Sequence, residues 1–128
     1  MKPEVKKALT EIEAEYSEAQ VAVREDGEGG AYVVVEEVDI GPLYRPSKSW
    51  IGFRITFQYP YADVYPHYVR GDLSRVDGRG LGEDMSPNTS FEDRVAVQIS
   101  RRSNQLDPAT QTALIKLKKV LAWLRSHT

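Results

Sequence analysis

Apolar residues near the N-terminus recur with the period of an amphipathic helix. Pro3 suits the first turn of a helix, where its missing N–H costs nothing. Four residues then follow at spacings of three and four, which places them on one helix face: Val5, Leu9, Ile12 and Tyr16. Most of the nearby Lys and Glu residues fall elsewhere. The pattern predicts an N-terminal helix that packs by one face.

After Gln20 the period changes to two, which is typical of β-strands. Val21 and Val23 alternate with polar neighbours, and a glycine-rich turn follows at residues 26–30. The next segment, residues 31–40, is rich in β-branched residues. The sequence therefore predicts a hairpin that joins two strands through this turn.

A third strand, after a loop at residues 41–47, shows the clearest alternation in the chain. We expect one face of it to turn towards the core, and Pro60 to end it. The residues of that face are Ile51, Phe53, Ile55, Phe57 and Tyr59. A short fourth strand is predicted at residues 67–70, after a stretch rich in proline and tyrosine.

The second half of the chain carries weaker patterns. Four glycines and several charges between residues 71 and 90 predict a long irregular loop, and short apolar alternation returns over 95–99. Asp107 followed by Pro108 predicts the start of a C-terminal helix, with Asp as N-cap and Pro in the first turn. Its apolar stripe is formed by Leu114, Leu117, Leu121 and Leu124.

Helices at the two ends of a run of sequential strands predict the α+β class. The expected architecture is an N-terminal helix, an antiparallel four-strand meander, a long irregular loop and a C-terminal helix. The 128 residues suit a single domain that covers residues 1–128.

Net charge and amino-acid composition reduce the number of function classes to consider. The net charge of −2 gives no support to nucleic-acid binding driven by bulk charge. The chain contains no cysteine, so it can form no disulfide or thiolate metal site and can perform no thiol catalysis. Because no apolar run approaches about 18–20 residues, we expect a cytoplasmic protein with no membrane partner. No metal site and no cofactor are expected.

Few residues offer chemistry when they are considered alone. His67 could act as a general base, but no Ser or carboxylate partner follows from spacing, so a structural or surface role is favoured. An unrelated α+β hydrolase that uses His67 is a third and weaker reading. The basic clusters at residues 101–102 and 116–119 are interpreted as a solvated face.

The arrangement as a whole resembles the ubiquitin-conjugating (UBC) family. Where that family has Phe-Pro-x-x-Tyr-Pro-x-x-Pro-Pro between two strands, this chain has Tyr-Pro-Tyr-Ala-Asp-Val-Tyr-Pro at residues 59–66. Where the family has His-Pro-Asn, residues 86–88 read Ser-Pro-Asn, and the family's catalytic Cys falls eight residues later, at Ala96. A divergent bacterial-type member suits the shorter C-terminus. The related noncatalytic RWD domains share a Tyr-Pro-x-x-x-Pro version of the first motif.

The resemblance implies a carrier that takes a ubiquitin-like protein from an activating enzyme and passes it to a target amine through a thioester. Asn88 would then stabilise the oxyanion, and position 96 would hold the nucleophile. A methyl group cannot attack a carbonyl, so the chain as written is inactive. Two explanations stay open: Ala96 replaces a native Cys in a working enzyme, or the protein is a naturally noncatalytic UBC-variant or RWD-like adaptor.

The resemblance also implies where partners bind. An activating enzyme would meet the exposed face of the first helix, at Lys6 and Lys7. Ligases or target proteins would dock on the loop at residues 60–66 and on the turn at residues 105–108. The residues assigned to these two docking sites are Tyr61, Asp63, Tyr65, Pro66, Leu106 and Pro108.

Overall fold

The computed structural model describes residues 1–103, 107 and 111–127. The chain runs in the order α1 (Pro3–Glu15), β1 (Val21–Glu25), β2 (Ala31–Asp39), β3 (Tyr44–Arg45), β4 (Lys48–Ile55), β5 (His67–Arg70), β6 (Ser74–Arg75), β7 (Met85–Phe91), β8 (Arg94–Ile99) and α2 (Ala113–Ser126). Six strands form an antiparallel sheet in the order β1-β2-β4-β5-β8-β7, and β3 pairs with β6. The chain therefore has the predicted α+β class.

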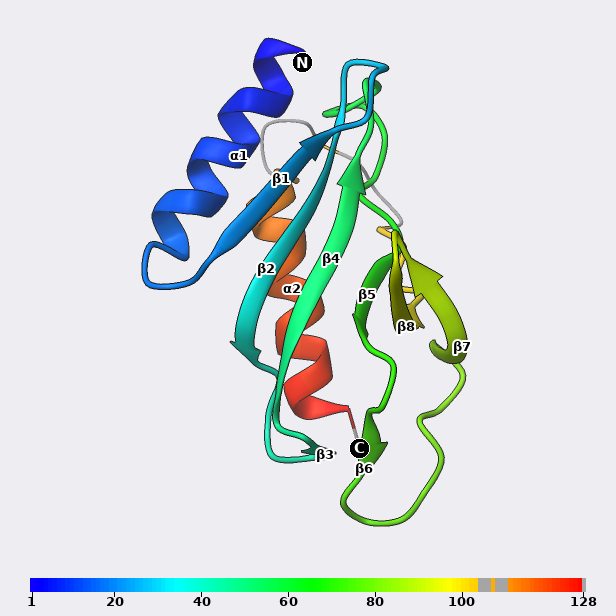
Figure 1. Cartoon of the computed structure of the whole chain (residues 1–128). Coiled ribbons are helices and arrows are strands. Elements are labelled where there is room, and N and C mark those ends of the chain that lie inside the picture. Colours follow the sequence, from blue (N-terminus) through cyan, green and yellow to red (C-terminus); the bar gives the residue numbers. More distant parts are fainter. Residues whose placement is uncertain (104–106, 108–110, 128) are drawn as a thin grey trace.

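Both helices cover the same face of the six-stranded sheet (Figure 1). The first begins at Pro3, as predicted, and buries four residues against the sheet: Val5, Ala8, Leu9 and Ile12. The hairpin over residues 21–39 and the short strand at residues 67–70 are confirmed as well. The sheet order β1-β2-β4-β5 contains the predicted meander, with the two-residue strand β3 inside one of its connections.

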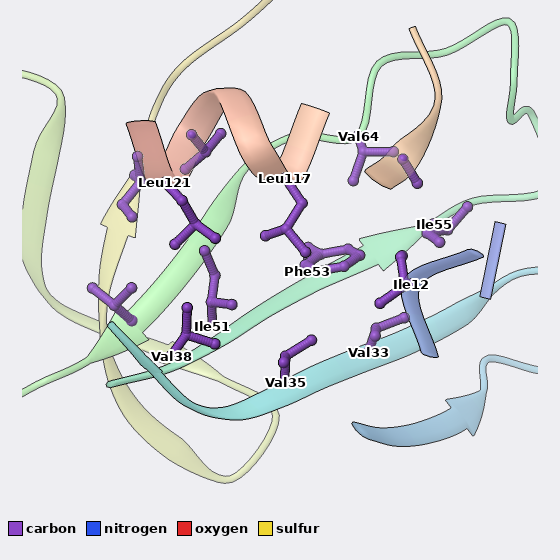
Figure 2. Close-up of a cluster of buried hydrophobic side chains, with 14 of the residues drawn as sticks. Ile12, Val33, Val35, Val38, Ile51, Phe53, Ile55, Val64, Leu117 and Leu121 are labelled. Carbon is purple, nitrogen blue, oxygen red and sulfur yellow. The ribbon is translucent and has the colours of Figure 1, made fainter. Parts of the chain in front are cut away.

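The core lies between β4 and α2. Ile51, Phe53 and Ile55 alternate along β4 and have no exposed surface. Leu117 and Leu121 extend from α2 towards them (Figure 2). Burying side chains of this size contributes about 1.5–3 kcal/mol each, so this contact is a main source of stability.

The predicted inward face of the third strand is wrong at Phe57. The strand ends at Ile55, and two successive turns follow, closed by hydrogen bonds from Tyr59 N to Thr56 O and from Tyr61 N to Gln58 O. Phe57 therefore leaves the strand alternation and is 52% exposed. Tyr59 is buried, but it reaches the core from the turn and not from the strand.

The predicted irregular loop at residues 71–90 is also wrong in part, because it contains β6 and most of β7. The strand β7 pairs with β8 as a hairpin that extends the sheet to six strands. Only its end residues Met85 and Phe91 are buried, and a bulge between Ser86 and Thr89 breaks its register. A polar strand with a bulge has no apolar alternation, which is why the sequence pattern did not reveal it.

The second helix starts later than Asp107 and Pro108 predict. Its N-cap is Thr112, whose hydroxyl accepts a hydrogen bond from Ile115 N at 3.2 Å. Leu117, Leu121 and Leu124 of the predicted stripe are buried, and Leu114 is partly buried. Pro108 lies outside the described residues.

Candidate functional site

A buried ammonium group joins three segments at one end of the sheet. Lys116 of α2 is 4% exposed. Its Nζ donates to Asp63 Oδ2 at 3.0 Å, to Ser103 Oγ at 2.9 Å and to the carbonyl of Arg101 at 2.6 Å. Asp63 Oδ2 also accepts from Ser103 N at 2.8 Å. All three donors of the ammonium are used, so this cation is structural and is not free to act on a ligand.

The proline-rich segment, residues 59–66, is anchored at a second point by Tyr59. Its hydroxyl accepts a hydrogen bond from Ala113 N at 3.1 Å, in the first turn of α2. Burial raises the pKa of this hydroxyl above its usual value. On the other side, Lys2 Nζ donates to the carbonyls of Phe57 and Tyr59 at 2.6 and 3.2 Å. Residues 56–62, which we call the aromatic turn, are therefore held by the first turn of α2 and by Lys2, the N-cap residue of α1.

Two large aromatic side chains project from the aromatic turn into solvent. Phe57 is 52% exposed and Tyr61 is 76% exposed. They border a shallow groove of about 420 Å³, to which Lys2 and Gln58 also contribute. Exposed apolar side chains on a braced turn suit a contact with another protein, because little conformational entropy is lost on binding.

The residues predicted to bind partners are only partly brought together. Lys6 and Lys7 are exposed on α1, and Lys7 shares a groove with Tyr59 and Pro60. The predicted activating-enzyme face therefore adjoins the aromatic turn.

Within the predicted docking loop, Tyr61 is exposed, whereas Tyr65 and Pro66 are half-buried. Asp63 is directed inward to Lys116, and only 13% of its side chain is exposed. Leu106 and Pro108 lie outside the described residues.

Asn88 and Ala96 lie close together on the β7–β8 hairpin. Thr89 is the register partner of Ala96 and donates its hydroxyl to the carbonyl of Ala96 at 2.8 Å. Asn88 precedes Thr89 in the bulge, with a φ of 63° that Asn tolerates better than most residues. It is exposed, whereas Ala96 has no exposed surface.

An aromatic layer covers Ala96 on the sheet face opposite the helices. Phe91 is the centre of this layer, with ring centroids 5.0 Å from Tyr68, 6.0 Å from Tyr32 and 6.2 Å from Trp50. Gly52 makes room for Phe91, because a Cβ there would lie 2.6 Å from its ring. A side chain at position 96 therefore points into a packed cluster and not into an open groove.

His67 lies inside the core, near Lys116 at the N-terminal end of α2. It is 1% exposed, and its ring packs against Phe53 with centroids 5.1 Å apart. Neither ring nitrogen has a hydrogen-bond partner among the described residues. Burial, assisted by the charge of Lys116 and opposed by Asp63, lowers the pKa of His67 to about 3. A neutral, covered imidazole suits the structural role that the sequence favoured.

The solvated-face interpretation of residues 116–119 is wrong at Lys116. The buried positions of α2 are 113, 116, 117, 120, 121 and 124, so Lys116 belongs to the apolar stripe by spacing alone. The signal that could have identified it was a lysine placed on the buried face of a helix. Its acidic partner is 53 residues away in the sequence and could not be assigned by spacing.

The described residues show neither a metal site nor a membrane-spanning helix. They contain no cluster of three His, Cys, Asp or Glu side chains that could hold a metal ion. None of the helices described is long and apolar enough to cross a membrane. Comparison of the chain with protein-family models, curated proteins and solved structures found no match.

The buried imidazole predicts a pH dependence that His67→Phe should remove. Below pH 6.5 the unfolded chain protonates His67, while the folded protein does so only near pH 3. The unfolded state therefore binds more protons, and stability falls as the pH falls through this window, by about 1.4 kcal/mol per unit. Urea unfolding at pH 7.5, 6 and 5 should show the two proteins diverging at acid pH. Parallel curves would contradict the assigned burial.

Proposed function

We propose that the chain is a noncatalytic protein-binding module with a UBC-like architecture, and that the aromatic turn is its contact surface. This is the adaptor alternative that the sequence left open. The observation that carries it is the burial of position 96 in a chain that has no thiol.

Two further features support the UBC-like part of the proposal. An N-terminal helix, an antiparallel meander with the proline-rich residues 59–66 before its fourth strand β5, and a C-terminal helix agree with that resemblance, whereas the β7–β8 hairpin extends the sheet beyond the four expected strands. The Pro-Asn element at residues 87–88 lies beside Ala96 on one hairpin. The closeness of Asn88 to Ala96 is what the resemblance requires of an oxyanion donor and a nucleophile.

A carrier of a ubiquitin-like protein would need more than the closeness of Asn88 to Ala96. The C-terminus of a ubiquitin-like protein must reach the nucleophile, and thiolate chemistry needs a partly exposed sulfur. Ala96 lies beneath the layer formed by Phe91 and its neighbours, with no exposed surface. The covered position favours the adaptor over the carrier with a missing Cys.

The contact surface is proposed from exposure and bracing together. Phe57 and Tyr61 are the aromatic anchors, and Lys7 on α1 lies close enough to contribute to the rim. Exposed aromatic residues surrounded by polar groups are typical of the residues that dominate protein interfaces. The partner would be a ubiquitin-like protein, its activating enzyme, or a ligase or target of that system.

Thiol accessibility distinguishes the adaptor from the carrier. We expect Ala96→Cys to react with a thiol reagent about tenfold or more slowly than Val95→Cys, because Val95 is 72% exposed on the same strand. In 6 M urea the two thiols should react alike. If Ala96→Cys reacts as fast as its neighbour in the folded protein and is loaded by a charged activating enzyme, the carrier function replaces the adaptor.

Photo-crosslinking tests the contact surface. Tyr61→p-benzoylphenylalanine, expressed in the cell that makes the chain, should capture a component of a ubiquitin-like system. Adding Phe57→Ser should lower the yield about tenfold, since it removes an anchor. It keeps the Phe57 carbonyl that Lys2 binds. The same photoreactive residue at Val95 is the matched control. Equal yields from positions 61 and 95 would refute this surface.

A further inference from the structure

A cleft of about 520 Å³ lies between α2 and residues 101–103, apart from the aromatic turn. Its size is that of a small-ligand site. Four cationic side chains line it: Arg101, Arg102, Lys116 and Lys119. Two carboxylates lie next to them, since Asp63 pairs with Lys116 and Asp84 pairs with Arg101. Among these six groups the positive charges exceed the negative ones by two, in a chain whose net charge is −2.

The excess charge belongs to Arg102 and Lys119. The neighbouring carboxylates Asp84, Asp63 and Glu15 pair with other cations, namely Arg101, Lys116 and Lys118. The guanidinium of Arg102 lies over the ring of Tyr65, 4.1 Å from its centroid. This cation–π contact restrains the guanidinium and leaves N–H groups available to an acceptor. Lys119 is exposed and approaches the cleft from α2.

The other side chains that line the cleft contribute positive charge or hold neighbouring side chains in place. Lys116 has all three donors engaged, so it contributes only its field. Arg101 lies over Trp123 at 4.9 Å, and Trp123 also stacks on His127 at 4.2 Å. The ring of Trp123 already contacts Arg101 and His127. It therefore braces a cation and is not available to stack on a flat ring of a ligand. Recognition in the cleft is therefore electrostatic.

We propose that this cleft binds a phosphate monoester, with Arg102 and Lys119 as the donors. The second ionisation of such a group has a pKa of about 6, so the group is close to a dianion at neutral pH. A dianion matches the combined charge of Arg102 and Lys119, whereas a carboxylate would match only one of them. The planar guanidinium of Arg102 is suited to two parallel hydrogen bonds to phosphate oxygens.

Titration followed by ¹⁵N–¹H NMR tests the proposal. The probes are O-phosphoserine as the free amino acid and a neutral peptide that contains one phosphoserine, with sodium chloride at equal ionic strength as the reference. We expect a saturable shift of the indole signal of Trp123, while amide signals of β1 stay unchanged. Arg102→Gln and Lys119→Gln should each weaken binding about tenfold or more, because each removes a charge-assisted hydrogen bond.

Lys118→Gln is the matched control, because it makes the same charge change at the next residue. Lys118 is exposed and pairs with Glu15, away from the cleft, so its replacement should leave the affinity unchanged. A shift that never saturates, or equal weakening in all three variants, would show general charge attraction and overturn the site. Tighter binding of the peptide would place the phosphate on a partner protein, and equal or tighter binding of the amino acid would indicate a small molecule. Both results keep the site.

Discussion

The ion pair of Lys116 with Asp63 holds together the end of the molecule on which both proposed binding surfaces depend. Removing a lysine and a carboxylate from water costs several kcal/mol per ion, and the cost is offset only where every donor finds an acceptor. Here Lys116 satisfies that condition through Asp63, Ser103 and the carbonyl of Arg101. The pair thereby fixes the proline-rich segment and residues 101–103 against α2.

The two proposed surfaces use the segments that this pair joins. The aromatic turn directly precedes Asp63; Tyr59 fastens it to α2, and Lys2 donates hydrogen bonds to two of its carbonyls. In the cleft, Arg102 lies over the ring of Tyr65, two residues after Asp63. A protein contact and an anion site would therefore share one rigid support, while the β7–β8 hairpin buries Ala96 on the opposite face.

Much of this fold could be predicted from local signals. Helix α1, the first hairpin and β4 follow from periodicity and turn residues, which need no distant partner. The strand β7 could not be found in this way, because it is polar and exposed between its two ends and a bulge breaks its register, so it has no apolar alternation. Phe57 left the strand pattern because the chain turns after Ile55. At the site, the sequence predicted Tyr61 as a surface contact. It did not predict the burial of Lys116, because that burial depends on Asp63, a partner far away in the sequence.

A double-mutant cycle on the central ion pair tests this account most directly. Lys116→Met alone and Asp63→Leu alone should each lower the free energy of unfolding by about 3–5 kcal/mol, because each leaves one buried charge unpaired. The variant with both substitutions should lose much less than the sum of the two losses, measured by urea unfolding at pH 7.5. If either single variant fails to fold while the double variant folds, the coupling is equally established. Small and additive losses would contradict the claim that this pair organises the structure.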